Sequence, residues 1–260
     1  MPDQGFFDIR NLSFAYGQHR ALSDVTVSLR AGCFHGLVGP NGSGKTTLLD
    51  TLLGLKKPGQ GQVLINGRSV FDLPRRELAC RLALVPQEFA INFAFTVREV
   101  VLMGRYPYQR RLAGPTAADL RMVDRALELM DITDMANQIV TELSSGEKQR
   151  VAIARALAQD TSALLLDEPT SNLDVSHAHR VLQVAADLAT KGRTIVAVLH
   201  DLNLAAAFCQ ELVLLKGGHL QAAGPTGLVL TSEHIRTAFR VEAAVEMNHY
   251  SERLAVSFKY

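Results

Sequence analysis

A glycine-rich loop between two patterned segments limits the possible folds of this 260-residue chain more than any other feature. The apolar run 34–38 is typical of a buried strand, and residues 45–55 have the pattern of a helix. The loop between them fits the phosphate-binding pattern G-x-x-x-x-G-K-[ST] and reads Gly39-Pro40-Asn41-Gly42-Ser43-Gly44-Lys45-Thr46, followed by Thr47. Its backbone N–H groups would wrap phosphates at the start of a helix, where the dipole favours anions. Lys45 would reach the outer phosphates and Thr46 would ligate Mg²⁺, so the segment predicts an α/β fold that binds a nucleoside triphosphate.

Two acids end a second strand-like run. Residues 163–166 are continuously apolar and lead into Asp167, Glu168 and Pro169. A parallel strand that is covered on both faces presents such groups at its carboxyl end. Asp167 is predicted to hold the magnesium shell, directly or through water, and Glu168 to orient and deprotonate the attacking water. The alternative, a solvated strand end with ordinary surface acids, is less favoured beside a phosphate loop.

Three more side chains are candidates from their positions. Gln87 follows a short apolar run and could touch magnesium or water as a neutral amide. His200 ends the apolar run 194–199 and is predicted near the terminal phosphate, although a lone histidine is more often structural. Tyr16 could stack on an adenine ring, whereas aromatic residues between strands usually belong to the core.

A helix start precedes the acidic strand end. Ser144 stands where an N-cap would, and Ser145, Gly146 and Glu147 lead into the helical pattern 149–158. Such an end binds anions. Because the chain already has one phosphate loop, a second anion site is useful if it serves a nucleotide held by another copy. The alternative is a capped helix without further role.

In chain order, these residues resemble the ATP-binding subunit of ATP-binding cassette (ABC) transporters over nearly the whole chain. The resemblance implies a head-to-tail dimer in which each ATP lies between the phosphate loop of one copy and the signature of the other. Hydrolysis would open the dimer and drive a membrane partner. The matching positions are Tyr16 (A-loop), Gly39 to Thr47 (Walker A), Gln87 (Q-loop), Leu143 to Glu147 (signature), Leu164 to Glu168 (Walker B), Ser171 to Asp174 (D-loop) and His200 (switch histidine).

The signature departs from the family pattern at two positions. The commonest form is Leu-Ser-Gly-Gly-Gln; here Ser145 replaces the first glycine and Glu147 replaces the glutamine, while Ser144 and Gly146 are retained. An active site is expected. A side chain at position 145 could narrow the approach of the partner's ATP, since glycine is often placed where backbone and ligand come close.

The resemblance implies the P-loop NTPase fold of an ABC cassette: a mainly parallel sheet core, an antiparallel β-subdomain and an inserted helical subdomain. We expect a single domain over 1–260, with residues 1–86 and 142–260 in the core and 87–141 in the helical part. The alternation near residues 6–30 is typical of antiparallel strands, and Thr96 begins a capping-box helix.

Composition adds limits. A formal charge of +1 gives no reason to expect nucleic acid. Cys33, Cys80 and Cys209 form no C-x-x-C, which fits a reducing compartment and argues against zinc or a disulfide framework. No run approaches the roughly 18 apolar residues that span a bilayer. The chain is therefore expected on the cytoplasmic face of the plasma (inner) membrane, bound through a partner.

Three functional hypotheses stay open. Residues 95–108 and 199–206 also resemble importers of iron chelates, haem or cobalamin. The leading hypothesis is therefore the ATPase of a metal-chelate importer, which acts with polytopic permease subunits and indirectly with a substrate-binding protein. The first alternative is the soluble ATPase of an assembly scaffold, such as that of iron-sulfur clusters. The second is a nucleotide-gated interaction module without useful turnover.

Overall fold

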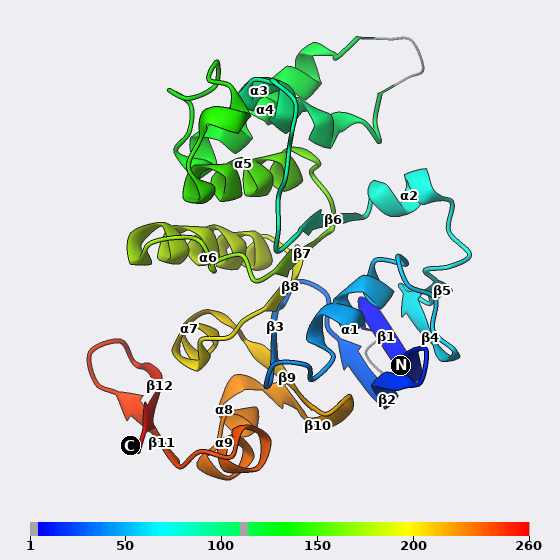
Figure 1. The fold of residues 1–260 in the computed structure, drawn as a ribbon, viewed down its shortest axis with the longest axis vertical. Helices are drawn as coiled ribbons and strands as arrows, with labels where there is room; N and C mark the ends of the chain where they lie inside the picture. The colour runs from blue at the N-terminus through cyan, green and yellow to red at the C-terminus, as the bar shows by residue number, and fades with distance from the viewer. Residues whose placement is uncertain (1–4, 110–113, 260) are drawn as a thin grey trace. The chain divides into compact units, whose positions relative to one another are not determined.

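The computed structural model describes residues 5–109 and 114–259 (Figure 1). They form two compact units, the first from residues up to Leu73 and from Leu188 onward, the second from Pro74 to Asp187. Each unit is described by itself. The predicted boundaries of the helical subdomain at 87 and 141 stay a prediction.

The first unit begins with an antiparallel sheet in the strand order β2-β1-β4-β5. Along β1, Phe7 and Ile9 are buried, which is the alternation expected of a strand with one face in the core, and a register irregularity after Ile9 moves the next buried position to Leu12. This confirms the antiparallel β region predicted near the start of the chain. The strands are β1 (Phe7–Tyr16), β2 (His19–Leu29), β4 (Gln60–Ile65) and β5 (Arg68–Ser69).

The first unit also holds a parallel group of strands around β3 (Phe34–Val38), which lies between β8 (Thr194–Val198) and β9 (Glu211–Lys216). Every residue of β3 and β8 is buried, because helices cover these strands, and every residue except His35 and Thr194 is accordingly apolar. Strand β10 (His219–Pro225) pairs with β9 in antiparallel orientation.

Helices of the first unit cover these strands. Helix α1 packs against β8, α7 against β3, and α8 and α9 against β9 and β10 (Figure 1). A terminal hairpin, β11 with β12, is held on α7 by the amide of Asn203, which bonds both the N–H and the carbonyl of Val256. The bounds are α1 (Lys45–Leu52), α7 (Leu202–Phe208), α8 (Thr226–Val229), α9 (Ser232–Phe239), β11 (Ala243–Asn248) and β12 (Arg253–Phe258).

The second unit contains the parallel pair β6 (Leu82–Val85) and β7 (Ala163–Asp167) and a group of mutually packed helices, α3, α4 and α5 (Figure 1). Capping boxes begin α3 at Thr96, as predicted, and α4 at Thr116. Within the described ranges, no helix is both long and apolar enough to cross a bilayer. The helices are α2 (Arg75–Ala79), α3 (Val97–Leu102), α4 (Ala117–Met130), α5 (Ser145–Ala158) and α6 (Val175–Thr190), with 3₁₀ turns at Met103–Arg105 and Val140–Glu142.

A buried ion pair ties the 3₁₀ turn after α3 to the start of α4. Nε of Arg105 donates to Oδ1 of Asp119 over 2.9 Å, and Nη1 of Arg105 donates to the carbonyl of Ala158. The other carboxylate oxygen of Asp119 accepts the hydroxyl and the backbone N–H of Thr116. These bonds, first from Thr116 and then from Arg105, lower the pKa of Asp119 to about 2.

We expect Asp119→Ala to lower the free energy of unfolding by about 3 kcal/mol at neutral pH, because it leaves the Arg105 charge buried without its carboxylate and removes a helix cap. The pKa of Asp119 is lower in the folded protein than in the unfolded chain. Its contribution is therefore complete above the unfolded value of about 4 and disappears as the pH falls through about 2. Chemical denaturation at several pH values measures this.

Asp124→Ala is the matched control, since Asp124 pairs with Arg98 on the exposed side of α4. Exposed pairs contribute about 1 kcal/mol or less. Equal losses for the two variants, or a loss at Asp119 that stays constant between pH 5 and pH 2, would contradict a stabilising role of the buried pair.

Candidate functional site

The backbone of the phosphate loop can be built only with glycine at two positions. Gly39 and Gly44 have φ values of 145° and 100°, in the region that side chains disfavour. A Cβ on Gly39 would collide with the carbonyl of Leu215, and one on Gly44 with the carbonyl of Ala21. The glycines of the motif therefore let this loop pass close to neighbouring backbone.

The turn between β9 and β10 braces the phosphate loop. The N–H of Gly218 donates to the carbonyl of Ser43 over 3.2 Å, and the carbonyl of Gly218 accepts the N–H of Ser23 over 2.8 Å. The loop that follows β3 is thus fixed by residues from a later part of the same unit, in addition to the start of α1.

Two polar side chains of the loop suit an anionic ligand. Lys45 is buried, and its Nζ donates to the carbonyls of Gly39 and Pro40 over 2.8 and 3.0 Å, which keeps the ammonium over the loop. The buried hydroxyl of Ser43 has no hydrogen-bond partner among the described residues. Because buried polar atoms are rarely left unpaired, an oxygen-rich ligand such as a phosphate fits this loop.

Tyr16 is the last residue of β1 and is 46% exposed. Lys56 donates to its hydroxyl and also lies 4.8 Å from the ring centroid, while Phe14 meets the ring edge-on with centroids 4.9 Å apart. The ring is therefore a surface platform rather than a core residue. Its face opposite Lys56 is the one that could receive a planar base.

His200 is exposed and follows β8, immediately before Asp201, which caps α7. The predicted placement of its ring near the terminal phosphate stays a prediction.

In the second unit, Gln87 and Glu168 come together. Nε2 of Gln87 donates to Oε2 of Glu168 over 2.9 Å. Asp167, which precedes Glu168 and is the last residue of β7, is buried. Glu168 has φ of 49° although it is not glycine and precedes Pro169. A positive φ at a non-glycine residue destabilises the folded state by on the order of 1–3 kcal/mol. Such a conformation persists only where the surrounding structure fixes it, and this is common at functional sites. The arrangement holds one carboxylate in a defined position.

The start of α5 is more strongly structured than the sequence indicated. Ser144 and Glu147 form a capping box: Oε2 of Glu147 accepts the N–H and the hydroxyl of Ser144, and the Ser144 hydroxyl accepts the N–H of Glu147. These bonds, chiefly from the Ser144 hydroxyl, lower the pKa of Glu147. The unusual acid at position 147 thus caps its own helix. The pattern S-x-x-E was the signal that identifies this role.

The two residues between the ends of this box differ in their surroundings. Ser145 is the exposed first residue of α5, as the predicted N-cap at Ser144 implies. A Cβ on Gly146 would lie 3.1 Å from the carbonyl of Asn172, so a larger residue would press on the segment that follows β7. Glycine at 146 therefore has a packing reason of its own.

Asp174, predicted to contact nucleotide, uses its carboxylate to bind the first residues of helix α6. Its carboxylate accepts the N–H of His177 over 2.9 Å, lies 2.9 Å from the His177 ring, and accepts the hydroxyl of Ser176. The pKa of Asp174 falls well below its usual range for these reasons, led by the backbone bond. Its predicted contact with nucleotide stays a prediction.

A strand, glycine loop and helix that suit phosphate, together with a positioned carboxylate after another parallel strand, define an ATPase of the P-loop class. The family model described as ABC transporter matches residues 22–171. The chain belongs to the ABC transporter family and contains its ATPase cassette.

Two curated relatives and two solved structures illustrate the similarity. The cobalamin import ATP-binding protein BtuD of Halobacterium salinarum is 46% identical over 239 residues, which cover 92% of this chain and 60% of that protein. The hemin import ATP-binding protein HmuV of Gloeobacter violaceus is 44% identical over 235 residues, covering 88% of this chain and 84% of the relative. The chain thus spans less than two thirds of the first relative and most of the second.

Among solved structures, one described as a metal-chelate type ABC transporter in an inward-facing conformation has a TM-score of 0.83 at 32% identity, over 97% of this chain and 96% of that one. A dimeric ATP-binding cassette in a post-hydrolysis state, bound to ADP and Pi, has a TM-score of 0.75 at 30% identity, over 85% and 98% of the two chains. Both similarities confirm the predicted cassette fold.

Proposed function

We propose that this chain binds ATP with Mg²⁺ and hydrolyses it in a head-to-tail dimer, and that hydrolysis energises import of a metal chelate of the cobalamin, haem or iron-siderophore kind through a membrane permease. The observation that carries the hydrolytic part is the Glu168 carboxylate, held in a strained backbone position and bonded by the Gln87 amide. The relatives named as import subunits support the direction of transport.

In this proposal the backbone N–H groups of residues 39–47 and the Lys45 ammonium bind the phosphates, and Tyr16 stacks on the base. Thr46, Asp167 and the Oε1 atom of Gln87 would hold Mg²⁺, since they offer the oxygen donors that this ion prefers. The ion would neutralise phosphate charge.

Glu168 accepts the proton of the attacking water, which lowers the barrier by making the oxygen more nucleophilic. Gln87 fixes the orientation of that carboxylate, and His200 contacts the terminal phosphate. In the dimer, Ser144, Ser145, Gly146 and Glu147 at the start of α5 and Asp174 face the nucleotide of the other copy. The dipole of α5 favours the phosphate there.

The alternative function, the ATPase of a soluble assembly scaffold, uses the same chemistry with another partner. Two experiments on the full chain separate these proposals. We expect the tagged protein to sediment with membranes and to co-purify with a polytopic protein. In proteoliposomes with that permease and its binding protein, ATP should drive uptake of cobalamin, haem or a ferric siderophore.

Lys45→Ala is the control and should lower uptake and ATPase activity by at least 100-fold, since the ammonium that binds the outer phosphates is lost. Co-purification with a soluble iron-sulfur scaffold, and no retention on membranes, would replace the import proposal by the scaffold one. Turnover that is unchanged in Lys45→Ala would contradict both.

A further inference from the structure

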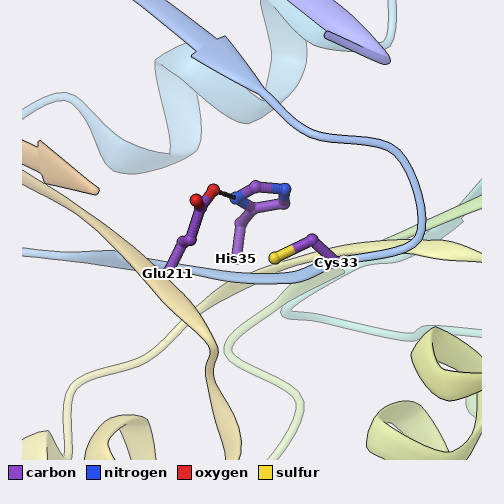
Figure 2. Close-up of side chains that lie close together, drawn as sticks. All are labelled: Cys33, His35 and Glu211. Carbon is purple, nitrogen blue, oxygen red and sulfur yellow. Dashed lines mark ion pairs between the residues drawn. The ribbon is translucent and has the colours of Figure 1, made fainter. Parts of the chain in front are cut away.

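A group of metal-ligating side chains lies in the first unit at the start of β3 and β9. Cys33 immediately precedes β3, His35 is its second residue and Glu211 is the first residue of β9 (Figure 2). One ligand atom from each residue lies within 4.8 Å of the others. The phosphate loop leaves β3 at the opposite, carboxyl end, so this group is separate from the residues proposed to bind ATP.

Strand pairing brings the three residues together. β3 and β9 are parallel, and His35 and Glu211 are direct partners in their register, which places both side chains on the same face. Cys33, two residues before His35, falls on that face by the alternation of an extended chain. Cys33 and His35 are buried, and the Glu211 side chain is only 11% exposed.

The hydrogen bonds of His35 leave one ring nitrogen in an unusual position. Nε2 lies 3.0 Å from the carbonyl of Arg30, which can only accept, so Nε2 carries a proton. In a neutral ring whose proton is on Nε2, Nδ1 bears a lone pair. That lone pair faces Oε2 of Glu211 at 3.1 Å, and Nδ1 has no hydrogen-bond partner among the described residues. The lone pairs of Nδ1 and Oε2 thus face each other in a buried place and repel. A cation bound between the two atoms would remove this repulsion.

We propose that Cys33 Sγ, His35 Nδ1 and a carboxylate oxygen of Glu211 bind one Zn²⁺, with water as a fourth ligand. Sulfur, imidazole and carboxylate together suit zinc better than the harder ions Mg²⁺ and Ca²⁺. Tetrahedral zinc requires donor atoms about 3.4–3.6 Å apart. The 3.1 Å between Nδ1 and Oε2 is close to this, and the largest separation between ligand atoms, within 4.8 Å, would have to shorten by about 1 Å when zinc binds.

The surroundings of the group match those of zinc ligands. A ligating histidine usually donates its other N–H to a carbonyl or carboxylate, as His35 does to Arg30. Arg30 also donates to the second oxygen of Glu211 over 2.6 Å, which fixes the carboxylate. A free cysteine thiol carries its proton at neutral pH, so Cys33 must release one proton to solvent when it binds zinc as the thiolate.

The proposal is tested on the full chain without nucleotide, after removal of metal by a chelator. One Zn²⁺ per chain should bind, with release of about one proton, and Co²⁺ should give the intense sulfur-to-cobalt charge-transfer band of a thiolate ligand. Zinc should also protect one thiol from alkylation. Binding of less than 0.2 Zn²⁺ per chain, or cobalt spectra without that band, would overturn the proposal on the unaltered protein alone.

The variants locate the site. Cys33→Ser and Glu211→Gln should each lower zinc affinity by at least 10-fold and Cys33→Ser should remove the cobalt band. Cys209→Ser is the matched control, because Cys209 is an equally buried cysteine that is not among the three ligands, and it should keep both. Loss of the band in Cys209→Ser with retention in Cys33→Ser would reject Cys33 as the ligand. Circular dichroism and thermal melting establish that each variant is folded.

Discussion

Glu168→Gln should bind ATP as the unaltered chain does and hydrolyse it about 10²- to 10⁴-fold more slowly. The amide keeps the shape of the side chain and can still meet the Gln87 amide, but it cannot take a proton from water. Because the negative charge beside the phosphates is also lost, nucleotide affinity should hold or rise. Single-turnover hydrolysis of radiolabelled ATP and equilibrium binding of a fluorescent ATP analogue measure the two effects separately.

Glu88→Gln is the matched control, since Glu88 is an exposed acid next to Gln87 with no proposed role. It should turn over normally. Near-normal turnover of Glu168→Gln would remove Glu168 as the base. A parallel fall in ATP affinity and rate would instead indicate that the acid positions nucleotide rather than water.

Ser144→Arg should leave ATP binding by the single chain unchanged and reduce hydrolysis by at least 100-fold. The proposed dimer offers the start of α5 to the ATP of the other copy, and a long side chain at the N-cap would fill that approach and break the capping box with Glu147. The variant Glu168→Gln should form a dimer when ATP is added, and the double variant with Ser144→Arg should not. Size-exclusion chromatography with light scattering measures this difference.

Thr96→Arg supplies the control for stability. Thr96 and Glu99 form the same capping box at the start of α3, so this variant loses an equivalent cap of about 1 kcal/mol without touching α5. It should hydrolyse ATP normally in solution. Unchanged hydrolysis in Ser144→Arg, or an equal loss in Thr96→Arg, would contradict a site shared between copies.

Local signals in the sequence predicted a large part of the fold. The buried runs at β3, β7 and β8 are mostly apolar because both faces are covered, and the capping box at Thr96 marks the start of α3. These features are decided by neighbours in sequence. For the same reason the phosphate loop could be recognised: its glycines, lysine and threonine are adjacent, and the backbone itself forms the proposed binding surface.

Features that depend on partners far away in sequence could not be predicted. Cys33 and His35 suggested no metal site, and the cysteine spacing argued against zinc, because the third ligand Glu211 arrives only through the pairing of β3 with β9. The hydrogen bond between Gln87 and Glu168 has the same origin, since it requires β6 and β7 to be neighbours. The spacing of ligands along the chain is contained in the sequence pattern, whereas the register between strands of a sheet is not.

The role of Glu147 at the start of helix α5 could also be predicted from a local pattern. The run from Ser144 to Glu147 is a capping box, so Ser144 is the N-cap, as predicted, and helix α5 begins at Ser145. Relative to the commonest signature, Glu147 replaces a glutamine. The structure gives it a positive reason, since its carboxylate accepts two hydrogen bonds from Ser144 and completes the helix end.

The bracing of the phosphate loop has a consequence for synthesis of the protein. Gly39 packs against the carbonyl of Leu215, and Gly218 donates to Ser43, so the phosphate loop of a nascent chain lacks these contacts until residues 215–218 have left the ribosome. Contacts between such distant segments form late, because a long loop must close first. Ribosome-bound chains that end before residue 215 should therefore fail to retain ATP.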